Sequence, residues 1–314
     1  MPWFFVPFVK ATIEPAVKGV YSMNRRSKFL AAQNRIGWLF IAPPVLLFFL
    51  FTFLPLIMAV VFSFTSYDII NPPKFIAFRN FQRILTDEFF WISLRNTATY
   101  TLLYVPSGLV LSLCVALFIN SKRKFVGLYR TLFYLPVLSS SVANATLWSW
   151  IYNPKMGLLN GLLSLIGVIG PSWLNDSKTA MFAIVIMSLW AGYAGNMMIF
   201  LAALKGVPDV LYEAAVIDGA SRWQQFMRIT VPSIRKTTFF VSTMLIIGTF
   251  QVFDAAYLLT SGGPGNATIT MVYYIYNRGF KDLKMGYASA MSLCLFAIIF
   301  VFSLINMRIN KEKD

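Results

Sequence analysis

The chain has 314 residues, of which 58% are hydrophobic and only 12% are charged. Soluble domains contain about a quarter charged residues, so this composition indicates an integral membrane protein. The formal net charge of +15 does not indicate nucleic-acid binding, because the basic residues are scattered singly between apolar runs. The sequence has no histidine, which excludes His-based catalytic triads, His-ligated zinc and histidine proton relays.

No catalytic constellation can be assembled from the remaining residue types. Cys114 and Cys294 both fall inside apolar segments, so we interpret them as small apolar side chains and not as a disulfide or a metal site. The GxxxxGK[ST] loop that binds nucleotide phosphates does not occur in the sequence. We therefore expect that this chain is not an enzyme and that it binds no cofactor or metal.

Six apolar segments are long enough to cross a membrane, because a spanning helix needs about 20 apolar residues. They cover residues 37–64, 94–119, 125–152, 179–204, 237–259 and 285–307. The first contains Pro43, Pro44 and Pro55, and we predict one kinked helix there because neighbouring groups can bond the carbonyls that proline frees. The predicted fold class is therefore all-α integral membrane, with six transmembrane helices.

The basic residues predict the orientation of these helices. Of the 27 Lys and Arg residues, 18 fall on the side that holds both chain ends, so both termini are predicted to be cytoplasmic. Residues 1–35 are interpreted as a cytoplasmic or interfacial arm and not a cleaved signal peptide, because their basic cluster follows the apolar stretch. Residues 36–308 form the predicted transmembrane domain, and residues 309–314 the cytoplasmic tail.

A polar stretch, LYEAAVIDGASRWQQFMRITVPSI at 211–234, separates the fourth and fifth apolar segments. Pro208 suits the first position of a helix, and Gly219 suits a left-handed C-terminal stop. Ser221 and Gln224 have the spacing of a capping box. We predict a cytoplasmic hairpin of two helices, 208–218 and 221–231, which Val231-Pro232 ends.

The first of these helices has a side that a partner can approach closely. Leu211, Ala214 and Ala215 share it by their helical spacing, and the two alanines leave little side chain there. Local chemistry equally allows an ordinary amphipathic linker packed on its own helices. A DNA-binding helix-turn-helix is disfavoured, because the hairpin is tethered to apolar segments at both ends and has no basic recognition face.

The hairpin carries the clearest resemblance to a known family. Its sequence EAAVIDGA at 213–220, followed by ITVP at 229–232, resembles the EAA loop of binding-protein-dependent ABC importer permeases, with Val231 where leucine is usual. Four further stretches resemble the maltose-type carbohydrate branch, in chain order. They lie at 79–97, 129–136, 250–254 and 259–264, and the similarity covers residues 36–308.

The resemblance implies a coupling function for the hairpin. A cytoplasmic ATPase subunit would seat it in a cleft, with Glu213 paired to a basic residue of that ATPase and Gly219 setting the turn. The implied coupling residues are Glu213, Ala214, Ala215, Asp218, Gly219 and Arg222. ATP and Mg would be used by the ATPase chains, which the resemblance places outside this polypeptide.

The resemblance also implies the partners and the location. The chain would be a permease of type I fold in a bacterial or archaeal inner membrane, moving a sugar or oligosaccharide by alternating access. Its partners would be a second permease subunit in a heterodimer, two ATPase subunits, an extracytoplasmic solute-binding protein and membrane lipid, with no nucleic acid. The segments 65–93 and 260–284 are the expected contacts of the binding protein.

Asp254 is the single acidic residue inside an apolar segment, and such residues mark functional sites by default. It also has a structural interpretation, in which it pairs with a basic group, caps a neighbouring helix or stabilises a gate. Polar and aromatic residues of the third, fourth and fifth segments can supply hydrogen bonds and ring faces to a neutral sugar. The candidates for the substrate path are Asp254, Gln251, Asn196, Tyr193, Trp190 and Asn144.

Three other functions are compatible with parts of this sequence. A permease for a polyamine, phosphate or other non-sugar solute would share the hairpin, but the sugar-branch motifs argue against it. A proton-coupled secondary carrier would need several titratable residues inside its spans, and the sequence has one. A non-transporting scaffold leaves the capped hairpin unexplained.

Overall fold

The computed structural model describes residues 37–120 and 125–311, so the predicted arm at 1–35 lies outside the described residues. The chain divides into two units, 1–58 and 59–314, which are described separately. The described part of the first unit belongs to the helix Gly37–Ser63, as predicted. This helix contains the π-helical turn η1 (Phe49–Phe53) directly before α3 (Leu54–Ser63), so the backbone is loosened just ahead of Pro55.

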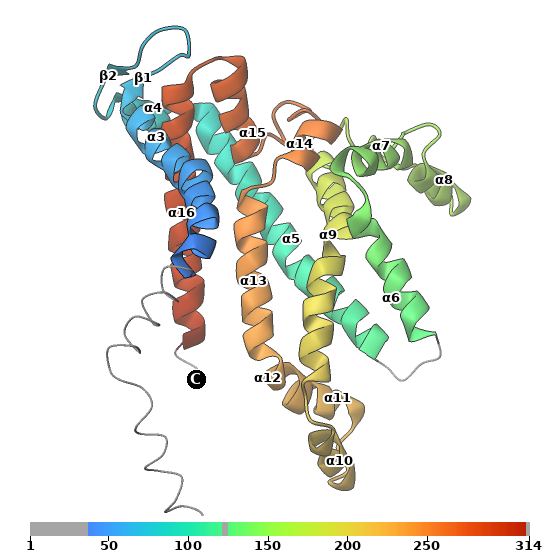
Figure 1. Ribbon diagram of the computed structural model, residues 1–314. Helices are drawn as coiled ribbons and strands as arrows, with labels where there is room; N and C mark the ends of the chain where they lie inside the picture. The colour runs from blue at the N-terminus through green and yellow to red at the C-terminus, as the bar shows by residue number, and fades with distance from the viewer. Residues whose placement is uncertain (1–36, 121–124, 312–314) are drawn as a thin grey trace, which may run out of the picture. The chain divides into compact units, whose positions relative to one another are not determined.

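Two long helices form the centre of the second unit. These are α5 (Glu88–Asn120) and α9 (Ala180–Lys205), which pack along each other (Figure 1). On α5 packs α13 (Arg235–Phe250), and on α13 packs α16 (Met285–Lys311). The larger apolar core lies among α5, α9 and α13, and a second apolar cluster joins the start of α5 to α16.

The close packing of α5 on α9 depends on small residues in α9. The Tyr104 hydroxyl lies where a Cβ of Gly192 would stand, and it donates a hydrogen bond of 3.3 Å to the carbonyl of Ser188. Ala194 is completely buried in the same helix. Without a side chain at Gly192 the two helices can approach closely, as small residues at helix contacts allow.

The predicted third and fifth spans are interrupted. The third consists of α6 (Val126–Tyr134), the 3₁₀ turn η2 (Leu135–Leu138) and α7 (Ser141–Ile151), and the fifth breaks between α13 and α14 (Asp254–Leu259). Continuous helices over 125–152 and 237–259 were therefore a wrong prediction. Pro136 has no N–H for the ladder, and the Ser140 side chain starts a new helix by accepting from the N–H of Ala143 at 3.2 Å.

Among the described residues, four helices have the length and apolar composition to cross a membrane. They are Gly37–Ser63, Glu88–Asn120, Ala180–Lys205 and Met285–Arg308. These correspond to the first, second, fourth and sixth predicted segments. Six crossings, and the cytoplasmic location of both chain ends, stay predictions.

Short elements connect these helices. The antiparallel pair β1 (Thr65–Ser66) and β2 (Lys74–Phe75) is followed by the amphipathic helix α4 (Arg79–Thr86). Near the other end of the chain, α15 (Met271–Tyr276) continues into the π-helical turn η4 (Asn277–Lys281). The remaining elements are α8 (Leu158–Leu165), α10 (Asp209–Ile217), α11 (Arg222–Gln225), η3 (Phe226–Thr230) and α12 (Val231–Ser233).

The loop before α15 is fastened to α5 by two adjacent side chains. The Asn96 amide donates to the carbonyls of Asn266 and Ile269 at 2.8 and 3.1 Å, and the Thr97 hydroxyl accepts from the N–H of Met271 at 2.9 Å. Asn96 and Thr97 therefore act as a clamp for backbone that has no regular hydrogen-bond partners of its own.

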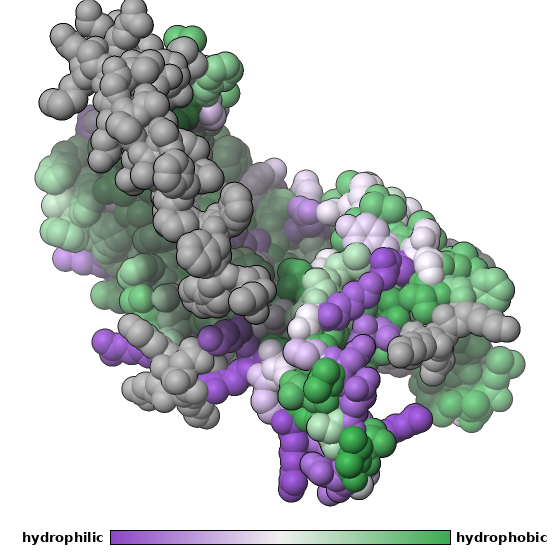
Figure 2. Space-filling model, turned by 60° about the horizontal axis from the view of Figure 1, so that its bottom comes forward, coloured by the Kyte–Doolittle hydropathy of each residue, from purple (hydrophilic) through white to green (hydrophobic). Residues whose placement is uncertain are grey.

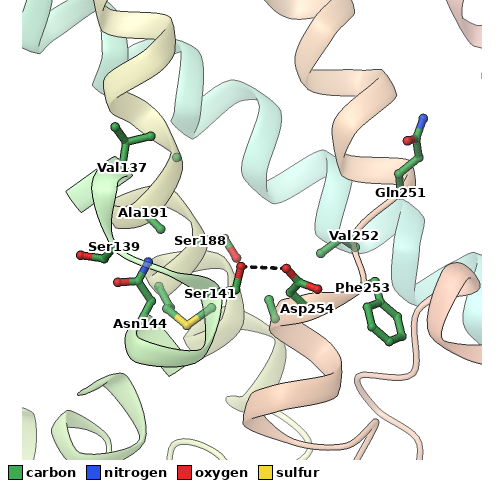
Figure 3. Close-up of a pocket in the computed structure, with 13 residues that line it drawn as sticks. Val137, Ser139, Ser141, Asn144, Ser188, Ala191, Gln251, Val252, Phe253 and Asp254 are labelled. Carbon is green, nitrogen blue, oxygen red and sulfur yellow. Dashed lines mark hydrogen bonds between the residues drawn. The ribbon is translucent and has the colours of Figure 1, made fainter. Parts of the chain in front are cut away.

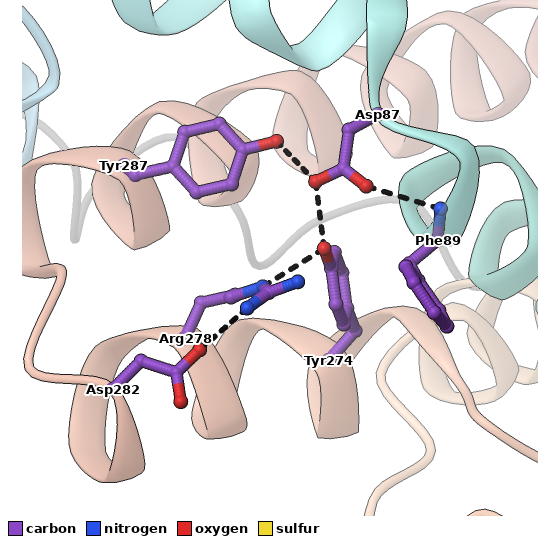
Figure 4. Close-up of polar contacts among 6 residues, drawn as sticks. All are labelled: Asp87, Phe89, Tyr274, Arg278, Asp282 and Tyr287. Atoms are coloured by element: carbon purple, nitrogen blue, oxygen red, sulfur yellow. Dashed lines mark hydrogen bonds and ion pairs between the residues drawn. The ribbon is translucent and has the colours of Figure 1, made fainter.

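Asp87 joins three elements through its side chain (Figure 4). These elements meet at the end of the unit opposite the hairpin helices α10 and α11 (Figure 1). Asp87 lies between α4 and α5, and its carboxylate accepts 2.6 Å hydrogen bonds from the hydroxyls of Tyr274 in α15 and Tyr287 in α16. The Arg278 guanidinium in turn donates to the Tyr274 hydroxyl and pairs with Asp282 at 2.6 Å. Partial burial alone would raise the pKa of Asp87, but these two hydroxyls and nearby backbone N–H groups hold it below its ordinary value.

Replacing Asp87 tests this junction. Asp87→Asn removes the charge to which both tyrosines donate, and we expect the free energy of unfolding to fall by about 1–2 kcal/mol at pH 7. Because the folded-state pKa is depressed, the carboxylate stabilises the fold above its unfolded pKa and loses this effect as the pH falls through the folded pKa. Thermal melting of the purified protein at pH 7 and in the acid range measures the difference, which should shrink on acidification.

Glu88→Gln is the matched control, because Glu88 is exposed and its carboxylate has no hydrogen bond or ion pair within the described chain. Equal melting curves for Asp87→Asn and the parent protein at pH 7 would contradict the structural importance of the junction.

Candidate functional site

The hairpin is the first candidate site, and its turn follows from two local motifs. Gly219 has a left-handed φ of +74°, and the N–H groups of Gly219 and Ala220 bond back to the carbonyls of Val216 and Ala215, which closes a Schellman motif. The predicted capping box follows. The Gln224 N–H bonds the Ser221 hydroxyl at 3.3 Å, and the Ser221 N–H bonds the Gln224 side chain at 2.8 Å.

The ends of the hairpin differ slightly from the prediction. Pro208 has an extended ψ of 128° and precedes the helix, which begins at Asp209. Val231-Pro232 does not end the second arm, which was a wrong prediction. The backbone passes through the π-helical turn η3 into α12. Pro232 stands in the first turn of α12, where a residue without an N–H donor is tolerated, and α13 starts at Arg235.

The two arms are bonded to each other, while the predicted coupling residues face outward. The hydroxyls of Tyr212 and Thr230 lie 2.9 Å apart, and the Gln225 amide donates to the carbonyl of Ala220 at 3.0 Å. The predicted coupling residues are exposed except Ala215, which is half-buried: Glu213, Ala214, Ala215, Asp218, Gly219 and Arg222. In the described part of the chain, the Glu213 carboxylate and the Arg222 guanidinium have no side-chain partner.

Large apolar side chains on the same hairpin are exposed, and we did not predict them as site residues. Ile217 is 86% exposed, Trp223 69% and Val216 64%. In the view from the hairpin end, hydrophobic and hydrophilic side chains alternate over the projecting part (Figure 2). Exposed apolar groups ringed by charges are typical of a protein-binding surface. In the sequence, the apolar pair Val216-Ile217 before Asp218 and Trp223 after Ser221 could have indicated this surface.

The second candidate site is a cavity of about 470 Å³ at the breaks of the third and fifth spans (Figure 3). The η2–α7 junction contributes Ser139, Ser141 and Asn144, α9 contributes Ser188, and the α13–α14 junction contributes Gln251. These groups are neutral hydrogen-bond donors and acceptors. Asp254 is the one charged residue among those that line the cavity.

Asp254 connects the two breaks. Its carboxylate accepts a hydrogen bond of 2.7 Å from the Ser141 hydroxyl, so the first residue of α14 contacts the first residue of α7 (Figure 3). We predicted that Asp254 would pair with a basic group or cap a neighbouring helix. In the described residues it contacts the end of the neighbouring helix α7, and no basic group pairs with it. The N-termini of both helices favour the negative charge there.

The other predicted path residues separate into two groups. Asn196 lines an adjacent cavity of about 360 Å³, which shares Gly192 and Val252 with the first. Tyr193 instead donates a 2.8 Å hydrogen bond to the carbonyl of Phe133, and Trp190 packs edge-on against Trp148 at 5.9 Å between ring centroids. Neither aromatic residue lines these two cavities, and the contacts of both pack α9 against its neighbours, while their place on the substrate path stays a prediction.

The comparison with known proteins identifies the family. Residues 96–313 match the family described as the inner membrane component of binding-protein-dependent transport systems. The chain belongs to this family. The match agrees with the resemblance that the hairpin and the four other motifs carry, and it removes the secondary-carrier and scaffold alternatives.

Similar proteins share almost the whole length. The probable ABC transporter permease protein YesP of Bacillus subtilis is 37% identical over 90% of this chain and 92% of its own length. The arabinooligosaccharides transport system permease protein AraP of the same organism is 32% identical over 97% of each chain. A chain in the crystal structure of a bacterial alginate ABC transporter, in complex with an alginate pentasaccharide-bound periplasmic protein, is 25% identical and superposes with a TM-score of 0.79, covering 88% of this chain and 93% of that chain. The fold is that of an ABC importer permease.

Tyr193→Phe tests the packing assignment. We expect the substitution to lower the free energy of unfolding by about 1 kcal/mol, because the bond to the Phe133 carbonyl is lost, and to leave transport by the assembled complex unchanged. Thermal melting and an uptake assay on the same preparation measure the two effects. Tyr129→Phe is the control, since the Tyr129 hydroxyl bonds no group in the described residues. Unchanged melting with impaired uptake would instead place Tyr193 on the substrate path.

Proposed function

We propose that this permease imports a sugar or oligosaccharide delivered by an extracytoplasmic solute-binding protein. The observation that supports this most directly is the lining of the larger cavity. Seryl hydroxyls and the amides of Asn144 and Gln251 match the hydroxyl groups of a neutral carbohydrate, and Phe253 supplies a ring face. The carbohydrate names of relatives such as AraP agree with this chemistry.

Charge separates this proposal from the non-sugar alternative. A phosphate site needs basic groups or clustered N–H donors, whereas the one charged residue of the cavity is the acid Asp254. A polyamine carries several positive charges, and a single carboxylate already bonded to Ser141 balances few of them. The substrate path in this proposal runs past Asp254, Gln251, Asn144 and Asn196.

The hairpin is the proposed coupling element. It follows α9 after three residues and leads through α12 into α13, and both long helices contribute residues to the larger cavity or to its neighbour. A displacement of the hairpin by an ATPase subunit therefore reaches the cavity through two helices. Alternating access results when ATP and the loaded binding protein have different affinities for the inward-facing and outward-facing states.

The assembly in this proposal contains four further components. A second, non-identical permease chain and two ATPase chains complete the transporter, and the binding protein docks at the segments 65–93 and 260–284. The membrane is the inner membrane of a bacterium or archaeon, crossed six times with both termini in the cytoplasm. ATP and Mg bind to the ATPase chains, because this chain has no phosphate-binding loop.

The substrate class is tested by uptake into native cells. We expect deletion of this chain to abolish ATP-dependent uptake of at least one member of a panel of radiolabelled disaccharides and oligosaccharides. Uptake of putrescine and inorganic phosphate should stay at the parental level. Loss of putrescine or phosphate uptake with every sugar unaffected would overturn the proposal.

The coupling role is tested by Glu213→Lys in the reconstituted transporter. We expect the complex to assemble at least in part and to hydrolyse ATP, while sugar transport falls to background, because the reversed charge meets a basic residue of the ATPase. Glu213→Asp keeps the negative charge at the same exposed position and serves as the control, with transport retained. Parental transport by Glu213→Lys vesicles would refute the coupling role.

A further inference from the structure

The connection between α7 and α9 has its charged residues only at its two ends. These are Lys155, Asp176 and Lys178, and residues 156–175 between them contain no charged side chain. The segment includes α8, which lies at the edge of the unit and packs on α7 (Figure 1). An aqueous loop of this length is normally polar, so the composition needs a physical explanation.

The exposed side of α8 and of the turn that follows it is apolar. Leu158, Leu162 and Leu165 follow a helical spacing of four and three residues, and they are exposed by 50, 52 and 81%. In the turn after α8, Ile166 and Ile169 are exposed by 73 and 97%. The opposite side of α8 faces the protein, where Leu159 packs against the main core. The helix therefore has a buried side and an outward apolar side.

Asn160 and the end of α8 make hydrogen bonds within the segment and its flanking residues. The Asn160 amide donates to the carbonyls of Pro154 and Pro171 at 3.1 and 3.2 Å, and its oxygen accepts from the Trp173 indole at 2.7 Å. Gly167, at a φ of +75°, ends α8 with N–H bonds back to the last turn. Self-contained hydrogen bonding of this kind is what the low-polarity region of a bilayer requires.

The helix before α8, which belongs to the predicted third span, also exposes apolar side chains. On α7, Val142, Leu147 and Trp150 are exposed by 61, 45 and 55%, and six residues separate the last residue of α7, Ile151, from the start of α8. Tryptophan is enriched where a spanning helix meets the headgroups. At eight residues α8 is too short to cross the bilayer, since it rises about 12 Å.

We propose that α8 and the turn after it, residues 158–169, form an interfacial anchor at the end of the spans opposite the hairpin, with their apolar side at the boundary between lipid headgroups and acyl chains. Lipid covers Leu165 and Ile169, and no charged side chain of residues 156–175 draws this side into water. The anchor fixes the end of α7 at the membrane surface and so helps to hold Ser141 and Asn144 at the cavity. The segment is therefore not a water-exposed loop.

Accessibility of spin labels tests this proposal in the complete transporter, reconstituted in vesicles of phosphatidylcholine and phosphatidylglycerol. Cys114 and Cys294 are first replaced by alanine, and single cysteines Leu165→Cys and Ile169→Cys are labelled with a nitroxide. Both parent side chains are largely exposed, so the label displaces no core contact. We expect relaxation of both labels to be enhanced strongly by oxygen, which partitions into lipid, and weakly by a water-soluble nickel chelate.

Ser177→Cys is the matched control, since Ser177 is exposed in the same connection between the charged residues Asp176 and Lys178. Its label should respond to the nickel chelate. A nickel response at both 165 and 169 equal to that at 177 would place α8 in water and overturn the proposal. Protection of both labels from oxygen and from nickel would also overturn it, because a protein partner would then cover the apolar side. Neither result bears on the substrate or on the coupling hairpin.

Discussion

Backbone N–H and C=O groups that leave a helix inside a bilayer must find partners in the protein, because lipid offers none. This constraint explains why the two helix breaks lie against each other. The Ser140 side chain caps α7, the Thr270 hydroxyl donates to the Val252 carbonyl at 2.9 Å, and Ser141 bonds Asp254. The bond between Ser141 and Asp254 joins the two breaks directly. The cavity and the interruptions of the third and fifth spans are one feature.

The two ends of the unit are stabilised in different ways. Opposite the hairpin, α5 and the residue before it, Asp87, hold the connecting segments through long-range bonds of Asp87, Asn96 and Thr97. The hairpin depends on local bonds, since its caps and its cross-arm contacts join residues at most 18 positions apart. Because its shape depends on local bonds, the hairpin can move as a rigid body when a partner displaces it. The connecting segments at the opposite end can stay in place during this movement.

The same difference decides what the sequence could predict. Gly219, Ser221 and Gln224 specify their turn through nearest neighbours, so the hairpin was predicted almost to the residue. The Asp254 partner is Ser141, 113 positions away, and no local pattern indicates that pairing. Tyr193 was predicted as a path residue because its type fits a sugar. Its hydroxyl is used in a helix contact that only the packing of α9 reveals. The breaks were missed because apolar residues continue on both sides of them.

The charge of Asp254 fits a neutral cargo better than a charged one. A lone carboxylate in a membrane cavity is costly unless dipoles face it, and here the N-termini of α7 and α14 meet at its position. Its single side-chain donor is a hydroxyl, which is the group that a sugar presents. A sugar hydroxyl that replaced Ser141 would preserve the bond and the charge balance while separating α14 from α7. In the proposed substrate path, this exchange of equivalent hydrogen bonds would link substrate entry to opening of the Ser141–Asp254 contact.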